Sequence, residues 1–319
     1  MSEHVSVREV GPRDGFQNEP EVIPTAEKVR LVECLARTGL RRLEVTSFVR
    51  ADVIPQLADG DHLLRSARIP EDVAVSVLVP NERGLDNALQ VRERGPKHPA
   101  RPGARGRVFD EVSLFLSASE THNRRNVNRS VQESLTGIER VIARARVEGL
   151  RCEGVISVAF GCPYEGEVPP ERVFAIARRL RDAGCAEIAF GDTTGMANPA
   201  QVRDFFRAAG DELDDVELTA HFHNTRGQGL ANVLAALDAG VRSFESSFGE
   251  LGGCPVPPGA TGNIASEDLV SMLHEMGYPT GIDLELLLAC ARDLQTVLGR
   301  PLGSHVLTAG PVDWQGRPV

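Results

Sequence analysis

The chain has 319 residues, of which 41% are hydrophobic and 25% are charged, an ordinary composition for a globular protein. This length suits one large α/β barrel or two smaller domains. The formal net charge of -10 argues against nucleic acid as the main partner. The first residues form neither a signal pattern nor an apolar run long enough to span a membrane. We therefore expect a cytoplasmic protein without a membrane partner.

Strand-like and helix-like segments alternate along the chain, which is typical of a parallel α/β sheet. The expected strands are residues 5–10, 42–46, 73–79, 111–116, 151–160, 187–190, 217–223 and 241–246. A loop is expected at 11–23. The expected helices are residues 24–39, 54–66, 82–92, 130–148, 170–183, one that begins after Asn198, 230–239, 265–276 and 283–298.

Eight strands with eight helical partners predict a (β/α)₈ barrel that forms one domain over residues 1–319. The helices from about 265 to 319 would complete the barrel and form a short C-terminal extension. The alternative is a doubly wound open sheet. That alternative lacks support, because residues 11–15 do not have the spacing of a glycine-rich nucleotide fingerprint.

Residues 92–107 interrupt the alternation with prolines and glycines. They contain six arginine or lysine residues against one glutamate, which gives a local charge of +5. We interpret this segment as a mobile surface insertion. A functional alternative is a basic flap that covers an anionic ligand.

The six cysteines show no C-x-x-C spacing, so the sequence contains neither a zinc ribbon nor a thioredoxin-like motif. In a reducing compartment most of them should be free thiols. Four lie in apolar surroundings and are expected to be small core residues, namely Cys34, Cys152, Cys185 and Cys290.

Lysine is nearly absent from the chain. Lys28 lies in a predicted surface helix and Lys97 lies in the basic insertion. A Schiff-base aldolase or a pyridoxal enzyme needs a lysine in its pocket, and neither residue is well placed for that role. A metal ion is therefore the favoured electron sink.

Two histidines, His221 and His223, end the predicted strand at 217–223. Residues two apart in a strand point to the same side, so both imidazoles can bind one divalent metal ion. The alternative is a pair of hydrogen-bonded histidines, because two ligands alone do not make a metal site.

Other polar groups follow the predicted strands at the end where a barrel places its reactive residues. Asp14 follows the first strand, Glu44 lies in the second and Asp192 follows the sixth. Asp14, the two histidines and a carbonyl such as that of Asn263 form a mixed oxygen and nitrogen set, which suits Mg²⁺ or Mn²⁺. Arg13 either pairs with Asp14 at the surface or faces an oxyanion beside the metal.

Residues 249–263 form a glycine- and proline-rich loop that contains Cys254. This loop could be a linker. A thiol on a mobile loop over a barrel mouth would instead enter the site only when the loop closes.

The chain resembles the 3-hydroxy-3-methylglutaryl-CoA lyase family of the DRE-TIM metallolyases from about residue 5 to 305. Five motifs in order carry this resemblance, namely 11–19 (GPRDGFQNE), 44–49 (EVTSFV), 191–193 (GDT), 221–223 (HFH) and 252–263 (GGCPVPPGATGN). The resemblance implies cleavage of an acyl-CoA such as 3-hydroxy-3-methylglutaryl-CoA to acetyl-CoA and a keto acid. It also implies a homodimer.

The resemblance also implies roles for individual residues. The implied ligands of Mg²⁺ or Mn²⁺ are Asp14, His221, His223 and Asn263. Arg13 would stabilise the thioester enolate, and Cys254 would transfer protons. Glu44 and Asp192 would be the other acid/base and positioning carboxylates.

Three departures from the family pattern fall near the predicted mouth. Phe16 stands where leucine is common, residues 224–227 read NTRG in place of DTYG, and Val256 stands where tyrosine is typical. These changes affect the expected acyl substrate more than the expected reaction. Arg226 could bind an additional carboxylate or could be a surface residue.

Two other classes of function remain as alternatives, namely a different enzyme of the same superfamily and a barrel without catalytic activity. A Claisen-type synthase, such as isopropylmalate or homocitrate synthase, shares the Arg-Asp pair and His-x-His, but the cysteine loop and the absence of a long C-terminal extension favour a lyase. A carboxyl-transferring relative would be expected to place a lysine at its metal. The second alternative, a catalytically inactive binding barrel, would be expected to have lost at least one predicted site residue.

Overall fold

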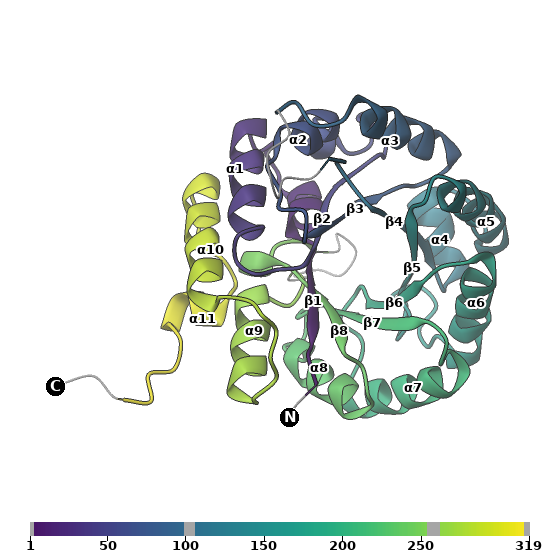
Figure 1. The fold of residues 1–319 in the computed structure, drawn as a ribbon. Helices are drawn as coiled ribbons and strands as arrows, with labels where there is room; N and C mark the ends of the chain where they lie inside the picture. Colours follow the sequence, from purple (N-terminus) through teal and green to yellow (C-terminus); the bar gives the residue numbers. More distant parts are fainter. Residues whose placement is uncertain (1–2, 99–105, 254–261, 316–319) are drawn as a thin grey trace.

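The computed structural model describes residues 3–98, 106–253 and 262–315. Eight strands pair in parallel in chain order, and pairing of the first with the last closes a barrel (Figure 1). The strands are β1 (Ser6–Glu9), β2 (Arg42–Ser47), β3 (Ala74–Leu78), β4 (Glu111–Ser117), β5 (Arg151–Ser157), β6 (Glu187–Asp192), β7 (Glu217–Phe222) and β8 (Ser243–Ser246). This closure confirms the predicted (β/α)₈ barrel and excludes the open sheet.

Helices surround the barrel, and α10 and α11 lie against its outside, next to α1 and α9 (Figure 1). The α-helices are α1 (Thr25–Leu35), α2 (Gly60–Ser66), α3 (Glu82–Arg94), α4 (Glu120–Val127), α5 (Val131–Val147), α6 (Pro170–Ala183), α7 (Pro199–Glu212), α8 (Gly229–Asp238), α9 (Ser266–Glu275), α10 (Leu284–Leu298) and α11 (His305–Ala309). In the described part of the chain, no helix is both long and apolar enough to cross a membrane.

Short helical turns replace two predicted elements. The expected loop at 11–23 begins with a π-helical turn, η1 (Gly11–Gly15), and a 3₁₀ turn, η2 (Phe16–Asn18). The helix expected at 54–66 is a 3₁₀ turn, η3 (Pro55–Leu57), followed by α2. A last 3₁₀ turn, η4 (Phe248–Glu250), follows β8.

Helix α4 is absent from the sequence-based prediction. Its residues are polar around the whole helix, so they lack the apolar periodicity that predicts a helix. Capping supports it instead: the Ser119 hydroxyl accepts a hydrogen bond from the His122 N–H, and Asn128 ends the helix in the left-handed conformation with φ of 54°.

The predicted basic insertion begins inside a helix. Residues 92–94 form the last turn of α3, and Gly95 ends that helix. Residues 99–105 lie outside the described part of the chain, so the interpretation of 92–107 as a mobile insertion stays a prediction.

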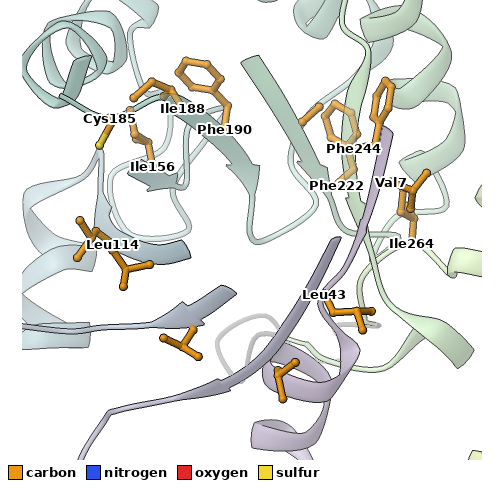
Figure 2. Close-up of a cluster of buried hydrophobic side chains, with 14 of the residues drawn as sticks. Val7, Leu43, Leu114, Ile156, Cys185, Ile188, Phe190, Phe222, Phe244 and Ile264 are labelled. Atoms are coloured by element: carbon orange, nitrogen blue, oxygen red, sulfur yellow. The ribbon is translucent and has the colours of Figure 1, made fainter. Parts of the chain in front are cut away.

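Alternate strand residues face outward and pack against the helices. Leu43, Leu114, Ile156, Phe222 and Phe244 are fully buried, and Figure 2 shows such side chains arranged around the barrel. Burying a side chain of this size contributes about 1.5–3 kcal/mol. This apolar layer holds the strands in the register that positions their polar ends.

The inward-facing residues form an ionic cluster, where barrels of this fold usually carry branched apolar side chains. Its members are Arg8, Arg42, Glu111, Arg151, Glu153, Glu187 and Glu245. The fully buried Arg8 guanidinium lies 3.1 Å from carboxylate oxygens of both Glu187 and Glu245, and it also contacts Glu153. Buried charges are tolerated only when paired, so these contacts depend on one another.

Lys28 is buried, and the prediction that it lies on the surface is wrong. The side chain of Lys28 has no solvent exposure, and its ammonium group lies 2.8 Å from the Asp59 carboxylate. It also donates a hydrogen bond to the Gln56 carbonyl. The lysine therefore joins α1 to the segment before α2.

Two of the predicted core thiols form a disulfide, which corrects the prediction for Cys34 and Cys290. The Cys34–Cys290 bond joins α1 to α10 across 256 residues of sequence. Cys152 and Cys185 are buried free thiols, as predicted, and so is Cys162. No local spacing indicates the bond, because it depends on the packing of two helices from opposite ends of the chain.

Reduction of the Cys34–Cys290 disulfide is expected to lower the free energy of unfolding by about 2–4 kcal/mol, because the bond limits the freedom of the unfolded chain. Thermal unfolding with and without reductant would measure this loss. The variant Cys34→Ala/Cys290→Ala should be insensitive to reductant, whereas Cys185→Ala should keep the wild-type sensitivity. Alkylation of all six cysteines in unreduced, unfolded protein would contradict the disulfide.

Candidate functional site

The π-helical turn η1 brings Arg13 and Asp14 to the mouth of the barrel directly after β1. The turn packs closely, because a Cβ atom on Gly11 would lie 2.5 Å from the Phe248 ring and 2.6 Å from a Glu9 oxygen. The Gly11 N–H donates to the same Glu9 oxygen at 2.7 Å. Only glycine fits at this position, so the GPRDG sequence determines where the next two side chains lie.

The two histidines meet at the end of β7, on the same side of the strand as predicted. The Nε2 atoms of His221 and His223 lie 3.1 Å apart. Together with a carboxylate oxygen of Asp14, they form a group of ligand atoms that all lie within 4.8 Å of one another. Three side chains from two strands therefore converge on one point, as the topology of a closed barrel predicts.

Asn263 adjoins this group from the segment that returns from the glycine-rich loop. Its Nδ2 donates to Asp14 Oδ2 at 2.8 Å and to the Leu251 carbonyl at 3.0 Å. Its Oδ1 is buried, and no residue in the described part of the chain hydrogen-bonds to it. A buried carbonyl oxygen without a donor beside a carboxylate and two imidazoles fits a divalent cation of the Mg²⁺ or Mn²⁺ type.

Asp14 is held as an anion by its neighbours. Burial acts to raise the pKa of Asp14, but Arg13, His221 and His223 outweigh burial and lower the pKa below its ordinary value. Gln17 Nε2 donates to Asp14 Oδ1 at 2.8 Å. Gln17 was not predicted as a site residue, although it lies within the GPRDGFQNE motif, one helical turn after Asp14.

Arg13 bridges two carboxylates. Its Nη1 lies 2.7 Å from Asp14 Oδ1, and its Nε lies 2.6 Å from Glu44 Oε2. Arg13 therefore lies in the site and is not the surface ion pair of the alternative interpretation. Burial raises the pKa of Glu44, an effect that Arg13 opposes. The other Glu44 oxygen, Oε1, is buried with no hydrogen-bond partner among the residues described.

Glu245 is a member of the site that the sequence analysis missed. Its Oε2 lies 2.8 Å from His221 Nδ1, and the strand register sets Glu245 opposite His221. Burial acts to lower the pKa of His221, but Glu245 and Asp14 raise it above its ordinary value. The available signal was a glutamate near the C-terminal end of the last predicted strand, where a barrel places its reactive residues.

Asp192 is not part of the group of possible metal ligands formed by Asp14, His221 and His223. Its Oδ1 accepts hydrogen bonds from the N–H groups of Met196 and Ala197, at 2.8 and 3.1 Å. Burial raises its pKa to about 7, although these two hydrogen bonds oppose the shift. Asp192 therefore holds the turn after β6, and its predicted acid/base role stays a prediction. Cys254 lies outside the described residues.

A cavity of about 470 Å³ opens above the group and is lined by residues from most of the barrel strands. Its lining includes Arg13, His221 and Glu245, together with the aromatic residues Phe115 and Tyr164. Arg226 is not part of this lining. It donates to the carbonyls of Thr194 and Gly195, at 2.8 Å each, so it holds the turn after β6.

Comparisons with known proteins show to which family the chain belongs. Residues 4–294 match the HMGL-like family. Hydroxymethylglutaryl-CoA lyase of Bacillus subtilis is 42% identical over 303 residues, which cover 95% of this chain and 96% of the relative. (R)-citramalyl-CoA lyase of Chloroflexus aurantiacus is 44% identical over 320 residues, which cover 97% of this chain and 96% of the relative.

Solved structures agree with this relationship. The HMG-CoA lyase of Bacillus subtilis superposes with a TM-score of 0.89 at 41% identity, covering 96% of this chain and 97% of that structure. An HMG-CoA lyase of Acinetobacter baumannii in complex with coenzyme A and 3-methylmalate also gives 0.89, at 37% identity, covering 99% and 98%. The chain therefore belongs to the hydroxymethylglutaryl-CoA lyase family of metal-dependent carbon–carbon lyases, the family that its five sequence motifs predict.

Proposed function

We propose that the protein uses a divalent metal ion, Mg²⁺ or Mn²⁺, to cleave 3-hydroxy-3-methylglutaryl-CoA or a closely related 3-hydroxy-acyl-CoA. The products would be acetyl-CoA and a keto acid. The observation that carries the proposal is the convergence of ligand atoms from Asp14, His221 and His223 within 4.8 Å, with Arg13 beside them. We further propose that residues 1–319 act as one lyase domain in a cytoplasmic homodimer.

The proposed metal ligands are Asp14, His221 and His223, with Asn263 as a fourth. Their donor atoms suit a cation that accepts both oxygen and nitrogen, and the orphaned Oδ1 of Asn263 supplies a further acceptor in the same buried site. When bound, such an ion makes a substrate hydroxyl more acidic and offsets the negative charge that develops on its oxygen.

The proposed reaction begins with loss of the proton from the C3 hydroxyl to a carboxylate base, for which Glu44 and Asp192 are the candidates. The electrons of that O–H bond form the new C=O bond. The C2–C3 bond then breaks, and its electron pair moves to C2, which leaves acetyl-CoA as its enolate. Addition of a proton to C2 completes the reaction, and Cys254 is the proposed donor.

Arg13 is proposed to stabilise the enolate oxygen. Glu44 and Asp14 hold its guanidinium on two sides at 2.6 and 2.7 Å, so the cation is oriented before substrate binds. A charge that is already positioned in a buried site needs no reorganisation as the enolate forms, and this is the main source of electrostatic catalysis.

(R)-citramalyl-CoA is a second candidate substrate, because a relative with 44% identity is named (R)-citramalyl-CoA lyase. Its skeleton lacks one methylene between C3 and the distal carboxylate of 3-hydroxy-3-methylglutaryl-CoA. A cavity distinguishes such a difference by only about 1–3 kcal/mol, so both compounds should be assayed.

Metal-dependent release of acetyl-CoA is the first expected outcome. Release from 3-hydroxy-3-methylglutaryl-CoA should require added Mg²⁺ or Mn²⁺ and should stop with a chelator. His221→Ala should lower kcat/KM by roughly 10³-fold, because the loss of a ligand removes several kcal/mol of stabilisation. The matched control is His274→Ala, whose ring in α9 hydrogen-bonds to Thr280, and it should keep wild-type activity. Activity that survives both chelation and His221→Ala would refute a metal role.

Arg13→Lys is expected to lower kcat by about 10²–10³-fold. Lysine keeps the charge but cannot hold both carboxylates with one planar group, so the cation loses its orientation toward the enolate. Arg226→Lys is the matched control, since in the described part of the chain this arginine hydrogen-bonds to two backbone carbonyls near the site. Steady-state kinetics on the same acyl-CoA would measure both variants. Equal losses in the two would indicate a general structural effect and contradict the role of Arg13.

A further inference from the structure

Glu245 connects His221, one of the possible metal ligands, to the ionic cluster inside the barrel. Its two carboxylate oxygens have different partners: Oε2 lies 2.8 Å from His221 Nδ1, and Oε1 lies 3.1 Å from Arg8 Nη1. All three side chains are buried. One carboxylate thus spans from a guanidinium in the barrel interior to an imidazole at the mouth.

This contact determines which nitrogen of His221 carries the proton. A carboxylate can only accept a hydrogen bond, so Nδ1 must carry a hydrogen and donate it to Glu245. In the neutral ring, Nε2 then presents its lone pair toward His223 Nε2, 3.1 Å away, and toward the oxygens of Asp14. This is the tautomer that can bind a metal ion through Nε2.

Arg8 prevents Glu245 from turning away. The arginine contacts Glu245, Glu187 and Glu111 at 3.1, 3.1 and 3.3 Å, and it also contacts Glu153. A rotation of the Glu245 carboxylate would break a charged contact in a buried site and leave the Arg8 charge less well compensated. The orientation of the His221 ring therefore depends on a residue deep in the barrel.

We propose that Glu245, anchored by Arg8, is a positioning residue that sets the tautomer and the ring orientation of His221 for metal binding. The inference rests on the proposed function insofar as the bound group is a divalent metal. It goes further in assigning a role to two residues that lie outside the ligand set.

A glutamine at position 245 has nearly the same shape and cannot replace the glutamate. If its oxygen accepted from His221 Nδ1, its amide NH₂ would face the Arg8 guanidinium, and two donors would oppose each other. If the amide turned around, its NH₂ would favour the other His221 tautomer, with the hydrogen on Nε2. Both arrangements weaken a metal site that uses Nε2.

Mn²⁺ binding to the metal-free full chain, measured by titration calorimetry, tests the proposal without an activity assay. Glu245→Gln is expected to weaken Mn²⁺ binding by about 10–100-fold, the usual effect of removing the partner of a metal-binding histidine. The matched control is Glu111→Gln, because Glu111 contacts Arg8 but not His221. This control should bind Mn²⁺ as the wild type does, even if its unfolding temperature falls.

Two results of the titration would overturn the proposal. One is unchanged Mn²⁺ affinity in Glu245→Gln. The other is an equal loss of affinity in Glu111→Gln, because this would assign the effect to the net charge of the ionic cluster. A folded wild-type chain that binds no Mn²⁺ would instead contradict the proposed metal-dependent function, so the two failures are distinguishable.

A second measurement needs neither a variant nor a metal ion. Nitrogen NMR of the histidine rings in the metal-free wild-type chain, at alkaline pH, reports which nitrogen carries the hydrogen. We expect His221 to be protonated on Nδ1. A His221 ring protonated on Nε2 would refute the proposal, even if Glu245→Gln fails to fold.

Discussion

A single buried guanidinium, that of Arg8, organises the interior of this barrel. Strands β4, β5, β6 and β8 each direct a glutamate toward it. Burial would lower the pKa of Arg8, but these carboxylates raise it well above its ordinary value, so the arginine stays charged. These contacts offset the cost of desolvating so many charges, and the loss of one partner leaves a buried charge less well compensated. The interior is therefore less tolerant of change than an apolar barrel core would be.

The same alternation of charge continues to the mouth. Glu245 links Arg8 to His221, and Asp14 links the histidines to Arg13, which in turn contacts Glu44. Each carboxylate in this series thus has a cation or an imidazole on at least one side. The arrangement allows several acidic groups to remain close together in a buried site while their orientations stay defined.

The sequence predicted the residues whose position depends on topology alone. Asp14 lies in the turn after β1, and His221 and His223 lie at the C-terminal end of β7, so closure of the barrel brings the three side chains together. Glu245 was not predicted, because its contact with His221 depends on the register between β7 and β8, which no local pattern records. The Cys34–Cys290 bond was missed for a related reason, since its partners are 256 residues apart. Helix α4 was missed because capping rather than apolar periodicity defines it.

Two departures from the family pattern, Phe16 and Arg226, lie outside the lining of the cavity. Phe16 is buried and packs edge-on against Phe248, with ring centroids 6.1 Å apart, and it does not line the cavity. Arg226 bonds to backbone carbonyls, so its guanidinium is engaged in holding a turn. Phe16 is thus accommodated by packing, and the exposed Arg226 by hydrogen bonds to the backbone. Selection among acyl groups should therefore depend on the residues that line the walls, such as Phe115 and Tyr164, and these are where a change of substrate should be sought.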